Sequence, residues 1–253
     1  MNTAFGTALK EWRTQRRMSQ LDLGLSANVS ARHISFLETG RSRPSRSMVL
    51  QLCEELEVPR VSRNHLLTAA GLAPAYANRN LSEDDMAPVR QAVDWMLERQ
   101  DPFPAIAMDR HWTIVKLNRA STMLLAGMGV GIGDSMLMAV AANEQIKAAL
   151  ENYDEVLHHL ICRVRTESAH LGGDPVLENA LEKLRAARSN EVPETEGIMP
   201  AFIPARYRAG GAVFSFFSTF SQFGTAEDIA LSELKIELMF PADEQTRSLL
   251  ESL

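Results

Sequence analysis

Apolar residues along the first 71 positions fall into short runs at helical spacing, and polar breaks separate the runs. Phe5, Leu9 and Trp12 lie three or four positions apart, which is typical of one face of an amphipathic helix, here ending near Arg17. Serines that begin later runs have the position of helix N-caps, and the pair Ser19 and Asp22 has capping-box spacing. The pattern predicts five helices, the last four of them capped by Ser19, Ser30, Ser45 and Ser62.

The second and third predicted helices have the lengths and the separation of a helix-turn-helix. The break at 27–30 leads into a helix over 31–39, which ends at Gly40, a residue type that favours the left-handed conformation after a helix. Ile34 and Leu37 form the buried side of this helix. Its other positions are therefore predicted to lie in the major groove of DNA.

Candidate DNA contacts follow from this geometry. Arg32 can pair with a guanine near the helix N-terminus, whereas His33 fits a base contact, a phosphate contact or an exposed capping position. The hydroxyl of Ser30 and the amide of Gln20 lie at helix N-termini, where a phosphate is favoured. The full predicted set is Gln20, Ser30, Ala31, Arg32, His33, Ser35, Arg41, Arg43 and Arg46, the last three being spaced to meet the DNA backbone.

The stretch from Met18 to Ser45 resembles the lambda-repressor-like (XRE) helix-turn-helix family. It contains the opening S-Q-x-x-L at Ser19 and the close I-S-x-L-E-x-G-x-x-x-P at Ile34. The resemblance covers about residues 5–71 and implies a five-helix DNA-binding domain. Gly24 is a departure, since the family usually has alanine there; it costs about 1 kcal/mol of helix propensity but preserves close helix packing.

The rest of the chain alternates between helical and strand patterns. Two strands are predicted first, then several helices, then three strands whose period-2 alternation indicates one buried and one wetter face. In the last strand Lys235 and Glu237 fall on the wetter face. The glycine-rich segment 127–133 follows a helix and lacks a Lys-Ser/Thr, so it is interpreted as a connector rather than a nucleotide loop. The predicted helices cover 82–99, 119–125, 143–171 with a bend near Asn152, 175–188 and 242–253. The predicted strands are 105–108, 113–117, 202–208, 212–223 and 232–240.

This order of elements is that of a PAS-like fold, an antiparallel sheet covered by helices. The chain also resembles the MmyB-like ligand-binding domain that follows XRE modules. The resemblance is clearest in the segments 104–120, 214–225 and 233–243. The fold class is therefore two domains, all-α followed by α+β. The helix-turn-helix domain is placed at 1–72, a linker at 73–82 and the PAS-like domain at 83–253.

The second resemblance implies control by a small apolar ligand, usually suggested to be a fatty acid or an acyl compound, and no other cofactor. Phenylalanines and thioethers suit such a pocket, although an aromatic stripe also fits a filled core. The anionic head group of such a ligand would need a cation. Arg163 or Arg206 could provide it, and a protonated His158 or His159 is the alternative. The candidate ligand residues are Met108, Trp112, Ile114, Met123, Met138, Arg163, Arg206, Phe214, Phe216 and Phe220.

The net charge of −6 conceals two opposite halves. Residues 1–80 carry 11 basic and 6 acidic side chains, whereas the remainder carries 15 and 26, so only the first half suits a polyanionic partner. Cys53 and Cys162, far apart, indicate free thiols, and no metal-binding spacing is present. No apolar run is long enough for a membrane span and no signal peptide is evident, so we expect a cytoplasmic protein.

Two functional hypotheses follow. The first is a homodimeric, sequence-specific regulator that binds double-stranded operator DNA under the control of an apolar ligand. The alternative is a ligand-independent repressor whose C-terminal domain only dimerises or binds a partner protein. An enzyme is disfavoured, because no paired carboxylates, nucleophile elbow or catalytic metal cluster occur in the sequence.

Overall fold

The computed structural model describes residues 3–79, 81, 83–189, 202–224 and 228–252. The chain forms two compact units. Unit 1 contains residues 1–78 with the segments 168–174 and 227–229, and unit 2 contains the rest. The predicted linker 73–82 includes residues 80 and 82, which lie outside the described residues, as does Leu253 at the end of the last predicted helix.

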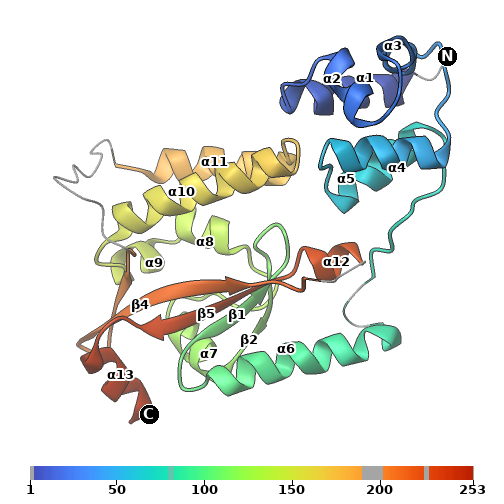
Figure 1. Cartoon of the computed structure of the whole chain (residues 1–253). Helices are drawn as coiled ribbons and strands as arrows, with labels where there is room; N and C mark the ends of the chain where they lie inside the picture. Colours follow the sequence, from blue (N-terminus) through green and yellow to red (C-terminus); the bar gives the residue numbers. More distant parts are fainter. Residues whose placement is uncertain (1–2, 80, 82, 190–201, 225–227, 253) are drawn as a thin grey trace. The chain divides into compact units, whose positions relative to one another are not determined.

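The N-terminal part of unit 1 is the predicted string of five helices (Figure 1). They are α1 (Thr3–Gln15), α2 (Gln20–Ser26), α3 (Ala31–Glu38), α4 (Arg46–Glu55) and α5 (Arg60–Ala69). Their apolar faces form one core around Leu23, Ile34 and Leu67, each of which is essentially inaccessible to solvent. The caps at Ser19, Ser30 and Ser45 are confirmed. Ser62 is not a cap: α5 begins earlier, after Pro59, because proline suits a helix start, and Ser62 is buried inside the helix.

Unit 2 is built on one five-stranded antiparallel sheet in the order β2-β1-β5-β4-β3. This confirms the predicted α+β fold with a sheet covered by helices. β1 and β5 occupy adjacent central positions, so the first and last strands of the unit pair directly. The strands are β1 (Ala105–Met108), β2 (Ile114–Leu117), β3 (Ala205–Ala209), β4 (Ala212–Ser221) and β5 (Lys235–Pro241).

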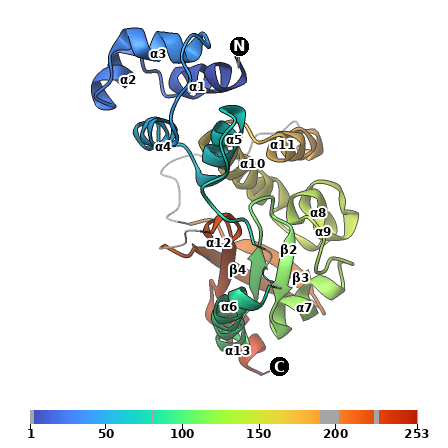
Figure 2. The same cartoon turned by 90° about the vertical axis from the view of Figure 1, so that its right-hand side faces the viewer.

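Helices cover both faces of the sheet. One face packs against α6 through a core that includes Val93, Leu97 and Ile236, and α8 to α11 lie on the other side (Figure 1). The helices α10 and α11 lie side by side in both views (Figures 1 and 2). The helical segments are η1 (Asp84–Met86), α6 (Ala87–Gln100), α7 (Arg119–Ala126), α8 (Met136–Ala142), α9 (Glu144–Ala149), α10 (Tyr153–His170), α11 (Pro175–Ala187), α12 (Ile229–Ser232) and α13 (Glu244–Glu251). None of the described helices has the length and apolarity that crossing a membrane requires.

Several predictions for unit 2 were wrong in detail. The helix expected over 143–171 is interrupted close to the predicted bend and forms two helices, α9 and α10. The short helices α8 and α12 were not predicted. The expectation that Lys235 lies on a wetter face is also wrong, because Lys235 is only 5% exposed. Alternation of polar and apolar residues marked the two faces of the strand correctly, but helices cover the polar face as well. The segment 127–133 connects α7 to α8, as predicted.

Candidate DNA interface and ligand cavity

The helix-turn-helix is held together by local caps and a close backbone approach. The hydroxyl of Ser30 accepts a hydrogen bond from the backbone N of His33 at 3.2 Å, which fixes the start of α3. Gly24 of α2 lies against the following turn, where its carbonyl oxygen accepts from the backbone N of Val29 at 2.7 Å. The absence of a side chain at Gly24 permits this approach, so α2 and α3 are placed closely without a spacer.

A buried carboxylate connects three helices beneath this surface. Glu38 at the end of α3 receives the Arg13 guanidinium of α1 in two hydrogen bonds, at 2.6 and 3.1 Å. It also accepts from the side-chain amide of Gln20 at 2.8 Å. The side chains of Arg13 and Glu38 are only 11% and 3% exposed. Gln20, predicted to meet phosphate, therefore has a structural partner that the sequence did not reveal.

The outer side of α3 carries the predicted reading residues. Arg32 is exposed, and its guanidinium lies 5.2 Å from the ring centroid of Phe36. Arg41 lies over the same ring at 5.8 Å, so a half-buried phenyl ring separates two cations on one surface. Ala31, His33 and Ser35 are partly buried along the same helix. The structure thus brings most of the predicted contacts together on α3 and the turn after it.

The last two predicted arginines have different environments. Arg43 is exposed in the turn between α3 and α4. Arg46 donates to the backbone oxygens of Ala73 and Pro74, at 2.5 and 3.1 Å, and so fixes the chain that leaves α5. Arg43 thus retains the environment expected of a phosphate contact, while the Arg46 guanidinium is held within the unit.

Unit 2 contains a cavity of about 480 Å³ between the sheet and the helices, within the range of small-molecule sites. Its wall is mainly apolar, with polar groups from Trp112, His159, Arg163, Ser218 and Glu237. A smaller cavity of about 170 Å³ lies beside α7 and α13. Phe216 of β4 lines both and is 2% exposed. The remaining lining of the large cavity is Ile106, Leu124, Leu125, Met128, Met136, Val140, Ile146, Leu150, Val156, Leu160, Phe202, Ile203, Ala205, Tyr207, Phe217, Phe220 and Met239.

Four of the ten predicted ligand residues line the large cavity: Trp112, Arg163, Phe216 and Phe220. The other six lie elsewhere. Met108 and Ile114 are fully buried, Met123 and Phe214 line the smaller cavity, and Met138 is exposed. Arg206 lies 4.0 Å from the carboxylate of Glu151. Strand alternation identified the aromatic stripe, but the helical methionines could not be placed because their neighbours are distant in the sequence.

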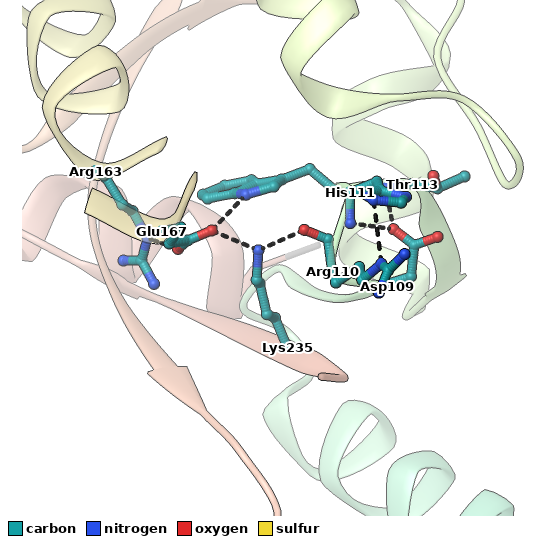
Figure 3. Close-up of polar contacts among 8 residues, drawn as sticks. Asp109, Arg110, His111, Thr113, Arg163, Glu167 and Lys235 are labelled. Atoms are coloured by element: carbon teal, nitrogen blue, oxygen red, sulfur yellow. Dashed lines mark hydrogen bonds and ion pairs between the residues drawn. The ribbon is translucent and has the colours of Figure 1, made fainter. Parts of the chain in front are cut away.

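A charged cluster contacts two residues of the cavity wall, Trp112 and Arg163 (Figure 3). Glu167 of α10 accepts from the Lys235 ammonium at 2.6 Å, from the Trp112 indole N at 2.9 Å, and from Arg163 at 3.0 Å. The Arg163 guanidinium lies 3.5 Å from the ring centroid of Phe220 on β4. Glu167 therefore orients both the indole and the one arginine that line the cavity among the described residues.

The pKa shifts in this cluster follow from burial and pairing. Burial opposes ionisation of Glu167, but Lys235 and the hydrogen bonds from Trp112 and Arg163 outweigh it, so the Glu167 pKa is lowered. Burial lowers the Lys235 pKa, and Glu167 partly compensates. Glu167 stays charged in neutral solution and keeps the cluster connected.

A tight turn presents Trp112 to the cluster. The Asp109 carboxylate accepts from the backbone N of His111 and of Thr113, each at 2.8 Å. Trp112 between them has φ of 64°, a left-handed conformation that is uncommon for a bulky residue. The two charge-assisted hydrogen bonds to Asp109 compensate for this strain and orient the indole toward Glu167.

The sequence also missed polar residues inside the cavity. Burial raises the pKa of Glu237, while a hydrogen bond from Ser218 and the charge of Arg163 partly oppose the shift. Burial also raises the pKa of Tyr207. Glu237 alternates with the apolar residues of β5, and this signal was interpreted as solvent exposure. His159 lines the cavity, whereas the adjacent His158 has an Nδ1 with no hydrogen-bond partner among the described residues.

Two family models match the chain. One, described as the MmyB-like transcription regulator ligand binding domain, matches residues 89–253 and so contains the whole cavity. The other, described as a helix-turn-helix domain, matches residues 4–66 and contains the surface formed by α2 and α3. These matches confirm both resemblances. No curated protein matches the chain.

Proposed function

The chain belongs to the MmyB-like transcription regulators, DNA-binding proteins with a ligand-binding domain, and on this premise we propose that a small apolar ligand in the unit 2 cavity controls operator binding. The ligand class is a fatty acid or an acyl compound. The observation that carries the proposal is the mainly apolar cavity of about 480 Å³ inside the matched ligand-binding domain. A ligand-independent regulator would not need such a space between its sheet and helices.

The cavity is suited to an alkyl chain energetically. Burial of eight methylenes contributes roughly 6 kcal/mol before the costs of association and ordering. The thioethers of Met128, Met136 and Met239 line the wall, and their flexible side chains adapt to an irregular apolar surface. The remaining affinity depends on the polar group of the ligand and its partners in the wall.

The proposal for DNA is a homodimer in which each protomer places one α3 in the major groove. Two half-sites about one helical turn apart would then be contacted together. A ligand changes operator affinity only if it binds one dimer geometry better than the other. The same proposal places the protein in the cytoplasm, with its operator.

Operator binding is tested by mutation of exposed arginines and titration of salt. Arg32→Ala should weaken specific binding by about 1–3 kcal/mol and relax base preference. Arg43→Ala should weaken all sequences similarly and reduce the salt slope by about 1. Arg185→Ala, an exposed arginine in α11, is the matched control and should change neither. Equal operator affinity for Arg32→Ala and wild type would contradict the assignment of α3 as the reading helix.

Ligand control is tested by mass spectrometry of the purified full chain and by operator titration with and without saturating alkyl compounds. Native mass spectra should show a dimer that carries an apolar small molecule. Operator affinity should change at least fivefold on saturation, since coupling energies between sites are typically about 1–3 kcal/mol. Unchanged operator affinity at saturating ligand would refute the switch and favour a C-terminal domain that serves dimerisation or partner binding.

A further inference from the structure

The large and the small cavity of unit 2 share part of their wall. Two residues line both cavities, Phe216 of β4 and Leu124 of α7. Phe214 lines only the small cavity, and Phe220 lines only the large one. The three phenylalanines are separated by even numbers of positions along β4, so they lie on one face of the sheet. The cavities therefore follow each other along this face, and Phe216 and Leu124 form the partition between them.

The partition is held from the sheet and from α7. Phe216 is buried, and its strand is paired with β3 on one side and with β5 on the other. The Phe216 ring stacks on Phe214, with 6.5 Å between the ring centroids. On the helix side, Ser121 of α7 donates a hydrogen bond to the backbone O of Ala105 at 2.8 Å, which fixes the helix that carries Leu124. A ligand in the large cavity thus meets a firmly supported wall.

The charged residues of the large cavity wall lie at Phe220, away from the partition. The Arg163 guanidinium lies 3.5 Å from the Phe220 ring centroid, and Glu237 is paired with Phe220 across β4 and β5. The Trp112 ring, whose indole N is polar, lies 5.7 Å from the Phe220 ring between centroids. Four positions of strand separate Phe220 from Phe216, a distance of roughly 13 Å. The polar group of a ligand therefore finds partners at the Phe220 end, and its alkyl chain extends toward Phe216.

The small cavity is suited to an alkyl chain, but it begins beyond the partition. Its wall is apolar apart from Arg119, which is exposed. Met123 in the same wall is also exposed, so the small cavity borders the surface of the unit. Its volume of about 170 Å³ is the space that an opened partition would add to the site of about 480 Å³.

We infer that the partition determines the chain length of the ligand: the alkyl chain ends against Phe216 and Leu124, and the small cavity stays outside the site. The inference rests on the proposed ligand-controlled function and assigns Phe216 as a specificity-determining residue. Each methylene that enters the large cavity contributes to binding. A methylene that has no space in front of Phe216 contributes nothing, because a well-packed wall does not yield without strain. Affinity should therefore rise with chain length up to a limit.

The experiment measures the affinity of the full chain for saturated fatty acids from octanoate to octadecanoate, by displacement of a fluorescent fatty-acid probe. In wild type each added methylene should tighten binding by about fourfold up to the limit, and longer chains should gain nothing. Phe216→Ala should move the limit by about two methylenes or more and tighten binding of the first chain beyond it by about tenfold. Met123→Ala, which enlarges only the small cavity, is the matched control and should keep the wild-type limit.

A second variant and a second series keep the inference testable if Phe216→Ala fails to fold. Leu124→Ala opens the partition from α7 and should move the limit in the same direction. The 1-alkanols, 1-decanol among them, should reach the wild-type limit at the same chain length as the fatty acids, because the end of the chain and not the polar group meets Phe216.

A wild-type affinity that rises throughout the series would overturn the inference. An unchanged limit in either folded partition variant, or a limit that Met123→Ala moves equally far, would overturn it as well. If no chain of any length binds, the proposed function is refuted too. A chain-length limit with unchanged operator affinity would support the inference and refute only the ligand switch.

Discussion

Replacement of Gly24 by alanine tests how closely α2 approaches the turn that leads into α3. A Cβ at Gly24 would lie 2.6 Å from the carbonyl oxygen of Val29 and 3.1 Å from the backbone N of Ala31. Both neighbours are backbone atoms, so neither can move by rotation of a side chain. A normal contact of 3.4 Å requires the Val29 oxygen to move by about 0.8 Å.

Two opposing effects determine the sign of this change. Alanine gains about 1 kcal/mol over glycine within a helix. Overpacking against fixed neighbours costs typically about 1–3 kcal/mol. We therefore expect Gly24→Ala to lower the free energy of unfolding by about 1 kcal/mol. Because the displaced turn carries the Ser30 cap, we also expect α3 to shift and operator affinity to fall.

Denaturant unfolding and operator titration provide the test, with Gly127→Ala as the control. Gly127 is the C-cap of α7 with φ of −66°, and a Cβ there meets nothing within 4 Å. This control should gain about 0.4–1 kcal/mol, because alanine reduces the entropy of the unfolded chain without strain. A Gly24→Ala protein as stable as wild type, with unchanged operator affinity, would refute the close approach as the reason for glycine.

Three further changes test the buried contacts. Arg13→Met should cost about 3–5 kcal/mol of unfolding free energy, because it leaves the buried Glu38 carboxylate without its cation. Addition of Glu38→Leu to the same protein should restore most of the loss. A cost below about 1 kcal/mol would contradict a structural role for the pair. The lowered Glu167 pKa adds stability that is fully present above its ordinary value of 4.5 and is lost as the pH falls through the lowered value. Glu167→Gln should therefore flatten the acid side of the pH-stability curve, and an unchanged acid slope would show that Glu167 is not the group responsible. Phe216→Ala should cost about 3–5 kcal/mol of unfolding free energy and join the two cavities, which calorimetry would detect as altered decanol affinity. Phe216→Leu should lose less unfolding free energy. Equal losses for the two variants would argue against a contribution from the enlarged cavity.

Local signals predicted the helix-turn-helix nearly completely. Ser19 and Ser30 cap their helices because a serine hydroxyl satisfies a free backbone N–H within three residues, a contact that depends only on neighbouring sequence. The predicted cap at Ser62 was wrong because serine also fits the interior of a helix. The N-cap position of α5 is occupied by Pro59 instead. The sequence correctly placed Arg32 on the exposed side of α3. The Glu38 contacts with Arg13 and Gln20 join residues 25 and 18 positions apart and required the fold.

The cavity was predictable only in part. Period-2 alternation identified the aromatic stripe of β4, and Phe216 and Phe220 do line the cavity. Met123 and Met138 were misplaced because they lie on helices, and their distance from the sheet depends on how α7 and α8 pack. Arg163 was selected as a possible cation, but its link to Glu167 and position over Phe220 depend on α10 covering the sheet.

The sequence alone determined the order of elements, the five N-terminal helices, the antiparallel sheet and the charge division between the halves, because each depends on periodicity, caps or composition within short segments. Tertiary structure alone decided which side chains share a cavity and which charges are paired. The alternation of Lys235 and Glu237 with apolar residues shows the difference. It correctly placed both on one face of β5, but only the helices packed over that face make Lys235 a buried partner of Glu167 and make Glu237 part of a cavity wall.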